Sequence, residues 1–109
     1  MAWLVREGDV LATAEVASSR RDRRRGLIGR DGFDGALVIR PARHVHTARM
    51  RFPLDVAFCD RDGTVLRTVC LRPWRLSPVV LRSAFVIEAQ AGSFDRWHLR
   101  SGDVVDVRE

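Results

Sequence analysis

The residues best suited to chemistry in this chain begin with two histidines, His44 and His46. They stand two positions apart, so in an extended segment both imidazoles would point to one face, as metal ligands often do. A zinc site needs about four ligands, and only Asp55, Glu88, His98 or the cysteines could complete one. Because two histidines alone are a weak signal, we expect no metal here, and we expect both imidazoles to form hydrogen bonds at a surface.

Two carboxylates, Asp55 and Glu88, are expected to lie inside the fold because each alternates with apolar residues. A buried carboxylate must be paired, and Arg49 and Arg51 are the basic residues nearest to Asp55 in sequence. We therefore expect a structural ion pair at Asp55. General acid or base work stays the alternative, because perturbed carboxylates also mark functional sites. The role of Glu88 is left open.

The two cysteines are expected to be free thiols. Asp62-Gly63 between two apolar runs predicts a tight hairpin turn, which sets Asp55 opposite Cys70. Cys59 then lies four residues from alignment with Cys70, or about 13 Å at about 3.3 Å per residue, which is beyond disulfide reach. We predict buried, inert packing residues.

The densest charge in the chain lies between Arg20 and Arg25, where only Asp22 is not arginine. Ser19, three residues before Asp22, is typical of a helix N-cap, so we predict a helix that runs to about Arg25–Ile28. A helix this short cannot hide its arginines, and a solvated face is expected. The functional alternative is a surface for phosphate or an acidic partner, because the guanidinium fork binds such groups in a bidentate manner.

Length and composition indicate one domain over residues 1–109, because 46% of the residues are hydrophobic and the chain is too short for a second core. No apolar run approaches the length of about 20 residues that spans a membrane, and the N-terminus does not resemble a signal peptide. We expect a cytoplasmic protein with no membrane partner.

The net charge of +5 comes from 19 basic and 14 acidic residues, and every basic residue is Arg. Lys, Asn and Tyr are absent together, which indicates a G/C-rich genome as the reason for choosing Arg. Nucleic acid is therefore not the expected partner, because phosphate affinity depends on a clustered basic face and not on a net excess. Weak nucleic-acid binding remains a second alternative.

Hydrophobic periodicity predicts a mainly β fold. Strands are expected at residues 10–16, 35–39, 84–89 and 102–107, and on both sides of the 62–63 turn. A short helix or turn capped by Ser93 is expected over residues 93–99. Both faces of the predicted hairpin are at least half apolar, which favours a closed or covered sheet. The expected class is α+β: a small barrel-like antiparallel sheet, one helix in the N-terminal half and a short helical turn near the C-terminus.

Seven short motifs follow one another along the chain: Arg23–Leu27, Gly35–Ile39, His46–Asp55, Asp60–Gly63, Pro73–Arg75, Ala91-Gly92 and Gly102-Asp103. Together they resemble the bacterial and archaeal family called domain of unknown function 192. The chain departs from that pattern at Ala48-Arg49, where an aromatic or small pair is more usual. The resemblance implies a barrel-like fold over nearly the whole chain, and it implies no reaction.

The function favoured by the sequence is a small non-enzymatic binding or accessory domain. Its polar pocket would take an anionic ligand or a protein segment between the loop His46–Phe52 and Pro73-Trp74-Arg75, without a cofactor. The pocket residues expected are His46, Arg49, Met50, Arg51, Asp55, Trp74, Arg75 and Glu88. The alternative is a hydrolase-like enzyme that uses Asp55 and Glu88 with His46. It ranks second because the chain contains no serine elbow, phosphate loop or complete metal signature.

Overall fold

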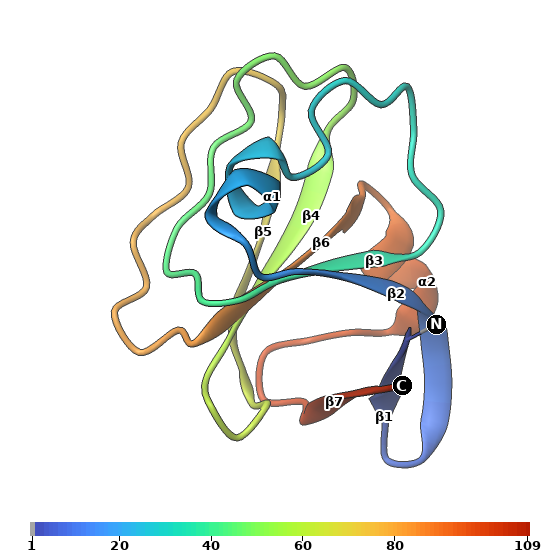
Figure 1. The fold of residues 1–109 in the computed structure, drawn as a ribbon. Helices are drawn as coiled ribbons and strands as arrows, with labels where there is room; N and C mark the ends of the chain where they lie inside the picture. Colours follow the sequence, from blue (N-terminus) through green and yellow to red (C-terminus); the bar gives the residue numbers. More distant parts are fainter. Residues whose placement is uncertain (1) are drawn as a thin grey trace.

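Seven strands form one curled sheet in the computed structural model, which describes residues 2–109 (Figure 1). The strands are β1 (Ala2–Arg6), β2 (Asp9–Ala17), β3 (Ala36–Ile39), β4 (Leu54–Cys59), β5 (Val65–Leu71), β6 (Phe85–Gln90) and β7 (Val105–Arg108). Their order across the sheet is β5-β4-β6-β3-β2-β1-β7. Neighbours are antiparallel except β2 and β3, which are parallel. The predicted mainly β, barrel-like class is confirmed.

The sheet curls into a half-barrel, and its two edges approach each other at one end. Thr64, just before β5, forms an isolated antiparallel bridge with Val104, just before β7. Gly63 lies so close that a Cβ atom there would sit 2.1 Å from the Val105 carbonyl oxygen, and its φ of 89° is left-handed. Only glycine fits both conditions. The Asp-x-x-Gly motif therefore makes this closure as well as the hairpin turn.

Two helices lie on opposite sides of the sheet (Figure 1): α1 (Arg20–Arg25) and α2 (Ser93–Trp97). The face that packs against Phe94 of α2, here the α2 face, carries Ala57, Cys59, Ile87 and Ala89. The opposite α1 face carries Leu54, Val56, Phe58 and Val86, which pack with Leu27 just after α1. Every residue of β4 is buried, as the predicted covered sheet requires. Among the described residues, neither helix is long and apolar enough to cross a membrane.

The local predictions that depend on short-range signals are confirmed. The Ser19 side chain accepts a hydrogen bond from the Asp22 amide at 3.1 Å and caps α1. In the hairpin, Asp55 pairs with Cys70 as expected. A bulge after Phe58 shifts the last pair, so that Cys59 faces Val65.

Three predictions are wrong or incomplete. The strand β1 was not predicted, and β2 exposes Val10 and Val16, although the apolar alternation at residues 10–16 is typical of a half-buried strand. The expected cap of α2 at Ser93 is also wrong. The N-cap residue is Gly92, which forms no side-chain cap of its own.

Candidate ligand cavity

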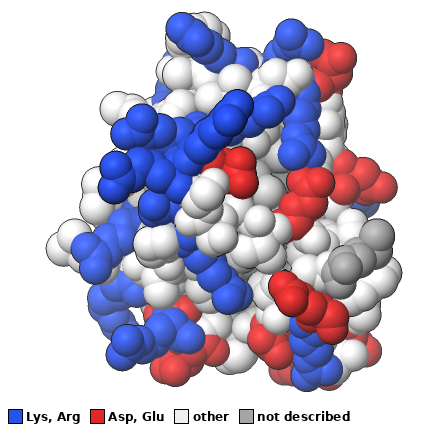
Figure 2. Space-filling view, viewed as in Figure 1, with Lys and Arg blue, Asp and Glu red and all other residues white. Residues whose placement is uncertain are grey.

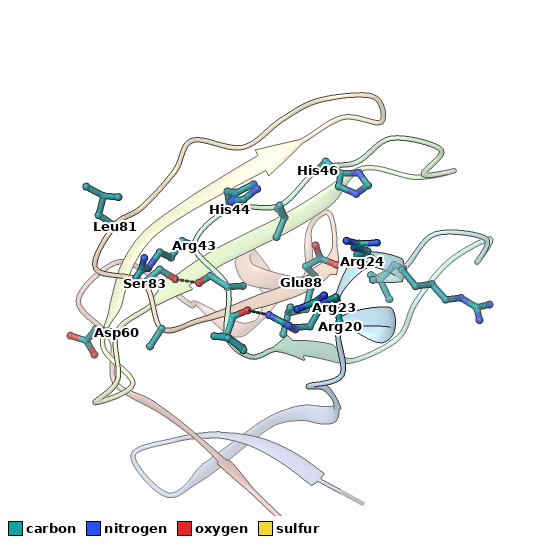
Figure 3. Close-up of a pocket in the computed structure, with 18 of the residues that line it drawn as sticks. Arg20, Arg23, Arg24, Arg43, His44, His46, Asp60, Leu81, Ser83 and Glu88 are labelled. Atoms are coloured by element: carbon teal, nitrogen blue, oxygen red, sulfur yellow. Dashed lines mark hydrogen bonds between the residues drawn. The ribbon is translucent and has the colours of Figure 1, made fainter.

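A cavity of about 1080 Å³ opens on the α1 face of the sheet. Figure 3 shows side chains from α1, from the loop 40–53 and from the loop 72–84 arranged around it. Part of its lining is apolar and includes Leu27, Ile39, Val45 and Met50, which belong to the core on this face. The remainder is mostly charged, so the cavity combines an apolar floor with polar walls.

Arginines supply most of the charge around the cavity. Arg20, Arg23, Arg24 and Arg25 come from α1, and Arg43, Arg61 and Arg82 come from three loops. Figure 2 shows blue arginine side chains gathered over α1 and its surroundings, while acidic residues lie mainly at the lower and right edges of the same view. The arginines of α1 are therefore one part of a larger basic surface contributed by several segments.

Arg23 is the most enclosed of the α1 arginines. Its Nη1 donates to the Pro41 carbonyl oxygen at 3.1 Å, which anchors the side chain to the loop 40–53. Its Nε is buried and has no hydrogen-bond partner within residues 2–109. The predicted solvated face thus holds for Arg20, Arg24 and Arg25, which are exposed, and not for Arg23.

Glu88 is the buried carboxyl of the cavity. It lies on β6 between Leu37 of β3 and Val56 of β4, and only 3% of the residue is exposed. Oε1 has no hydrogen-bond partner in the part of the chain that the structure describes. Burial raises the pKa of this carboxyl from 4.5 to about 7, because loss of water disfavours the charged form.

Gly26, the C-cap of α1, brings the backbone against this carboxyl. A Cβ atom at position 26 would lie 3.1 Å from Oε1 of Glu88, and φ at this residue is 49°. A larger residue would therefore be strained and would press on the carboxyl. The Arg-rich motif ending in Gly-Leu places a helix end directly over Glu88.

Asp55 lies on the opposite face. Its Oδ2 accepts hydrogen bonds from the amides of Gly92 at 2.9 Å and Phe94 at 3.1 Å. The expected partnership with Arg49 or Arg51 is therefore wrong, since backbone donors at the start of α2 satisfy the carboxylate. The Arg51 guanidinium instead contacts Asp31 at the surface.

The register separates the two carboxylates. Val56 pairs with Glu88, and Asp55 pairs with Ala89. Because paired residues share a face and neighbours along a strand alternate, Asp55 and Glu88 point to opposite sides of the sheet. The paired-carboxylate site of the hydrolase alternative is thus not formed.

Thr47, which sequence reasoning missed, joins the two loops expected to form the pocket rim. The residue is fully buried. Its Oγ1 donates to the Arg72 carbonyl at 2.6 Å and accepts from the Arg75 amide at 2.8 Å. Its own carbonyl accepts from the Trp74 amide at 2.8 Å. The two loops are therefore adjacent, as predicted, through a residue type that is a common short side-chain bridge to backbone.

The structure brings together only part of the predicted pocket. His46, Met50 and Glu88 line the cavity. Arg49, Arg51, Trp74 and Arg75 are exposed on the neighbouring loops and are not in its lining, and Asp55 is on the other face. Residues of the lining that were not predicted as pocket residues include Arg23, Arg24, Gly26 and Arg43.

The two histidines share one side of the loop 40–53, as expected. Both are exposed and line the cavity, while Val45 between them is buried. The Nδ1 atom of His46 accepts from the Ala48 amide at 3.3 Å. Within residues 2–109, no three His, Cys, Asp or Glu side chains are grouped in a way that could hold a metal ion.

Both cysteines are free, as predicted, but only Cys59 is buried. Burial and then the charge of Asp60 raise the pKa of Cys59 to about 12. Cys70 is exposed on the edge strand β5, which corrects the expectation of two buried thiols. Its pKa is also raised, first by partial desolvation and then by the negative charge of Asp55.

Comparison with known proteins gives a family and a fold. Residues 3–107 match the family DUF192, described as Uncharacterized ACR. No curated protein matches significantly. A crystal structure of a protein of unknown function from Novosphingobium aromaticivorans has a TM-score of 0.80 at 19% identity, covering 96% of this chain and 82% of that one.

A second crystal structure, from Sinorhizobium meliloti, carries a provisional description as a transcription regulator. Its TM-score is 0.79 at 23% identity, and the match covers 97% of this chain and 91% of that one. At such identities both likenesses establish the shared fold and leave the ligand open.

Proposed function

Because the chain belongs to the DUF192 family, which is described as uncharacterized, we propose a function from the cavity itself: a small non-enzymatic binding module for an anionic ligand. The observation that carries the proposal is Glu88, a buried carboxyl without a partner at a cavity walled by arginines. Buried polar groups in folded proteins are nearly always satisfied. One that lines a cavity without a partner is therefore a candidate ligand contact.

The size and lining of the cavity favour a small molecule over a protein segment. Ligand sites are commonly clefts of roughly 300–1,000 Å³ with a mostly apolar lining and few polar groups that fix orientation. This cavity is of that order. The arginines that surround it would attract an anion and bind it through charge-assisted hydrogen bonds.

The enzyme alternative loses its main support because Asp55 and Glu88 face opposite sides of the sheet. The nucleic-acid alternative keeps one observation in its favour, the gathering of arginines over α1 in Figure 2. A surface that binds only phosphates would lose affinity steeply with salt. Salt dependence therefore separates a small-ligand cavity from a weak nucleic-acid surface.

Calorimetric titration with inorganic phosphate and ethyl phosphate tests the proposal, and native mass spectrometry of the purified protein tests for a bound small molecule. Arg24→Gln, in the cavity, should weaken binding of the phosphate probes about tenfold, because a charge-assisted hydrogen bond contributes about 1.5–3 kcal/mol. Arg67→Gln is the matched control, since Arg67 is an exposed arginine of β5 outside the cavity lining. It should leave binding unchanged.

Equal weakening by both arginine variants would show that general charge binds the probe, and the cavity would lose its role. Duplex DNA serves as the comparison ligand. Its binding should vanish by about 0.2 M salt, whereas tight DNA binding at that salt would replace the small-ligand proposal with the nucleic-acid one.

A further inference from the structure

Two side chains of opposite charge line the same cavity without pairing with each other. The Arg23 guanidinium is held through Nη1 by the Pro41 carbonyl, and its Nε has no acceptor. The Glu88 carboxyl has no donor at Oε1. No ion pair joins them among the described residues. One hydrogen-bond donor and one acceptor group in the same cavity are thus left with unused capacity.

We propose, building on the proposed function, that the ligand is bifunctional: it carries a hydroxyl or ammonium donor a short distance from its anionic group. The donor binds the Glu88 carboxylate, and the anion binds Arg23 and the neighbouring arginines of α1. An ammonium or hydroxyl group supplies what the carboxylate lacks, and an oxyanion supplies what the guanidinium lacks. Phosphorylated amino alcohols and phosphorylated diols are ligands of this class.

The surroundings of Glu88 favour a donor over a second anion. The other charged or titratable groups of the cavity are the four α1 arginines, Arg43 and the two histidines of loop 40–53, Asp60, Arg61 and Asp62 of the β4–β5 turn, and Arg82. Beneath them, Glu88 is set among Leu37, Val56 and the backbone of Gly26. An anion placed there would meet a like charge whenever Glu88 is ionised, whereas a donor is attracted to it.

Such a site would discriminate strongly by chemistry. A site built to hydrogen-bond a polar group rejects analogues that lack the group, because its own polar atom stays unpaired and buried. Glu88 would then select for the donor, while the arginines would accept any small phosphate or carboxylate. The two parts of the site can therefore be tested separately.

The test compares three phosphate monoesters by calorimetry: ethyl, 2-hydroxyethyl and 2-aminoethyl phosphate. At pH 8 the aminoethyl ester should bind at least about tenfold more tightly than the ethyl ester, with the hydroxyethyl ester between them. The ratio should fall about tenfold between pH 8 and pH 6, because protonation of Glu88 removes the acceptor charge. Because the ammonium group lowers the second phosphate pKa of the aminoethyl ester, the ratio at each pH is compared with the same ratio in Glu88→Met, which lacks the titrating carboxyl.

Two variants at position 88 sharpen the result. Glu88→Met removes the acceptor and should abolish the preference for the aminoethyl and hydroxyethyl esters over the ethyl ester, and it is expected to fold because it replaces an unpaired buried carboxyl with an apolar side chain. Glu88→Gln keeps a neutral acceptor. It should retain some preference for the hydroxyethyl ester and lose the dependence of the ratio on pH.

The outcomes separate this inference from the proposed function. Equal binding of the three esters to the unmodified protein overturns the donor inference and leaves the anion site standing. A preference for the ethyl ester, or an aminoethyl-to-ethyl ratio that rises at pH 6 relative to the ratio in Glu88→Met, also overturns it, since the Glu88 carboxylate would then not be the acceptor. Failure of all three esters and of inorganic phosphate to bind overturns both.

Discussion

Asp55 and Glu88 are two buried carboxyls on neighbouring strands, β4 and β6, that differ in how they are satisfied. Asp55 on the α2 face receives two backbone hydrogen bonds, from Gly92 and Phe94. Glu88 on the α1 face has an oxygen without any partner in the described part of the chain. The fold thus supplies hydrogen-bond donors to one buried carboxyl and leaves the other without them.

The difference teaches where a ligand would act. At Asp55 the protein itself fills the acceptor positions, so the carboxylate orders the start of α2 and contributes to stability. At Glu88 burial costs free energy that no internal contact offsets, as the raised pKa records. Natural proteins keep such uncompensated groups mainly at functional sites.

The largest effect is expected at Asp55. Asp55→Ala removes the acceptor for two amides and leaves the buried Phe94 amide and the part-buried Gly92 amide without their partner. We expect the free energy of unfolding to fall by roughly 3–5 kcal/mol, from two hydrogen bonds to a charged group. Urea unfolding at pH 7 measures the loss. Asp55→Asn, which keeps one acceptor oxygen, should lose less, and a fully stable Asp55→Ala protein would contradict the structural role.

Removing the ionised Glu88 carboxyl should have the opposite effect, because its charge lowers the free energy of unfolding. The pKa rises from 4.5 in the unfolded chain to about 7 in the fold, so the folded state holds its proton more tightly. Its contribution is therefore least unfavourable below about pH 4.5, and stability declines as pH rises through 7. The full change is about 3 kcal/mol, at 1.36 kcal/mol per pKa unit.

The measurement is the difference between the pH–stability curves of the unmodified protein and Glu88→Gln, which removes the effects of the other titrating groups. The curves should converge toward acid pH and separate toward pH 8, where the variant gains relative stability. Parallel curves would mean that Glu88 has found a partner in solution.

Thr47 tests whether the loss of stability on substitution depends on satisfied hydrogen bonds and not on the face of the sheet. It belongs to the loops on the α1 face, yet its hydroxyl is fully satisfied by Arg72 and Arg75. Thr47→Val should therefore resemble the loss at Asp55 and cost about 2 kcal/mol. Thr47→Ser keeps the hydroxyl and is the control in thermal unfolding. If Val at position 47 were tolerated as well as Ser, the bridge between the loops would contribute little.

The sequence predicted the elements whose signals are local. The Asp62-Gly63 signal predicted the hairpin, but a two-residue turn would pair Cys59 with position 66, whereas Cys59 pairs with Val65. The bulge at Phe58 restores the predicted register, so that Asp55 still pairs with Cys70. Ser19 predicted the start of α1 from a local signal as well. β1 pairs with β2 across the two-residue turn Glu7-Gly8, a local signal that the sequence analysis did not use, whereas its pairing with β7, about a hundred residues away, has no local signal.

The site was predictable only in part, because a sequence pattern can show that a carboxyl is buried without showing which groups form hydrogen bonds with it. Alternation along the strands correctly indicated that Asp55 and Glu88 are buried. Sequence proximity then suggested an arginine for Asp55, whereas the donors come from residues 92 and 94, which only the folded sheet brings near. The closeness of α1 to Glu88 likewise depends on tertiary packing at Gly26.

The smallest effect expected is on the reactivity of Cys70, which depends on desolvation and, after it, on the negative charge of Asp55. Cys70 is exposed and lies opposite Asp55 in the hairpin, whereas Cys59 is buried. Iodoacetamide should therefore label Cys70 in the folded protein and Cys59 only after unfolding, as read by intact mass. Because desolvation and then the Asp55 charge raise the pKa of Cys70, labelling should be slow at neutral pH and faster in base.

Asp55→Asn removes the charge and should speed labelling of Cys70 severalfold at pH 8, while Cys59 stays protected. An unchanged rate in that variant would mean that desolvation alone raises the pKa of Cys70, and that Asp55 acts on α2 without acting on the thiol.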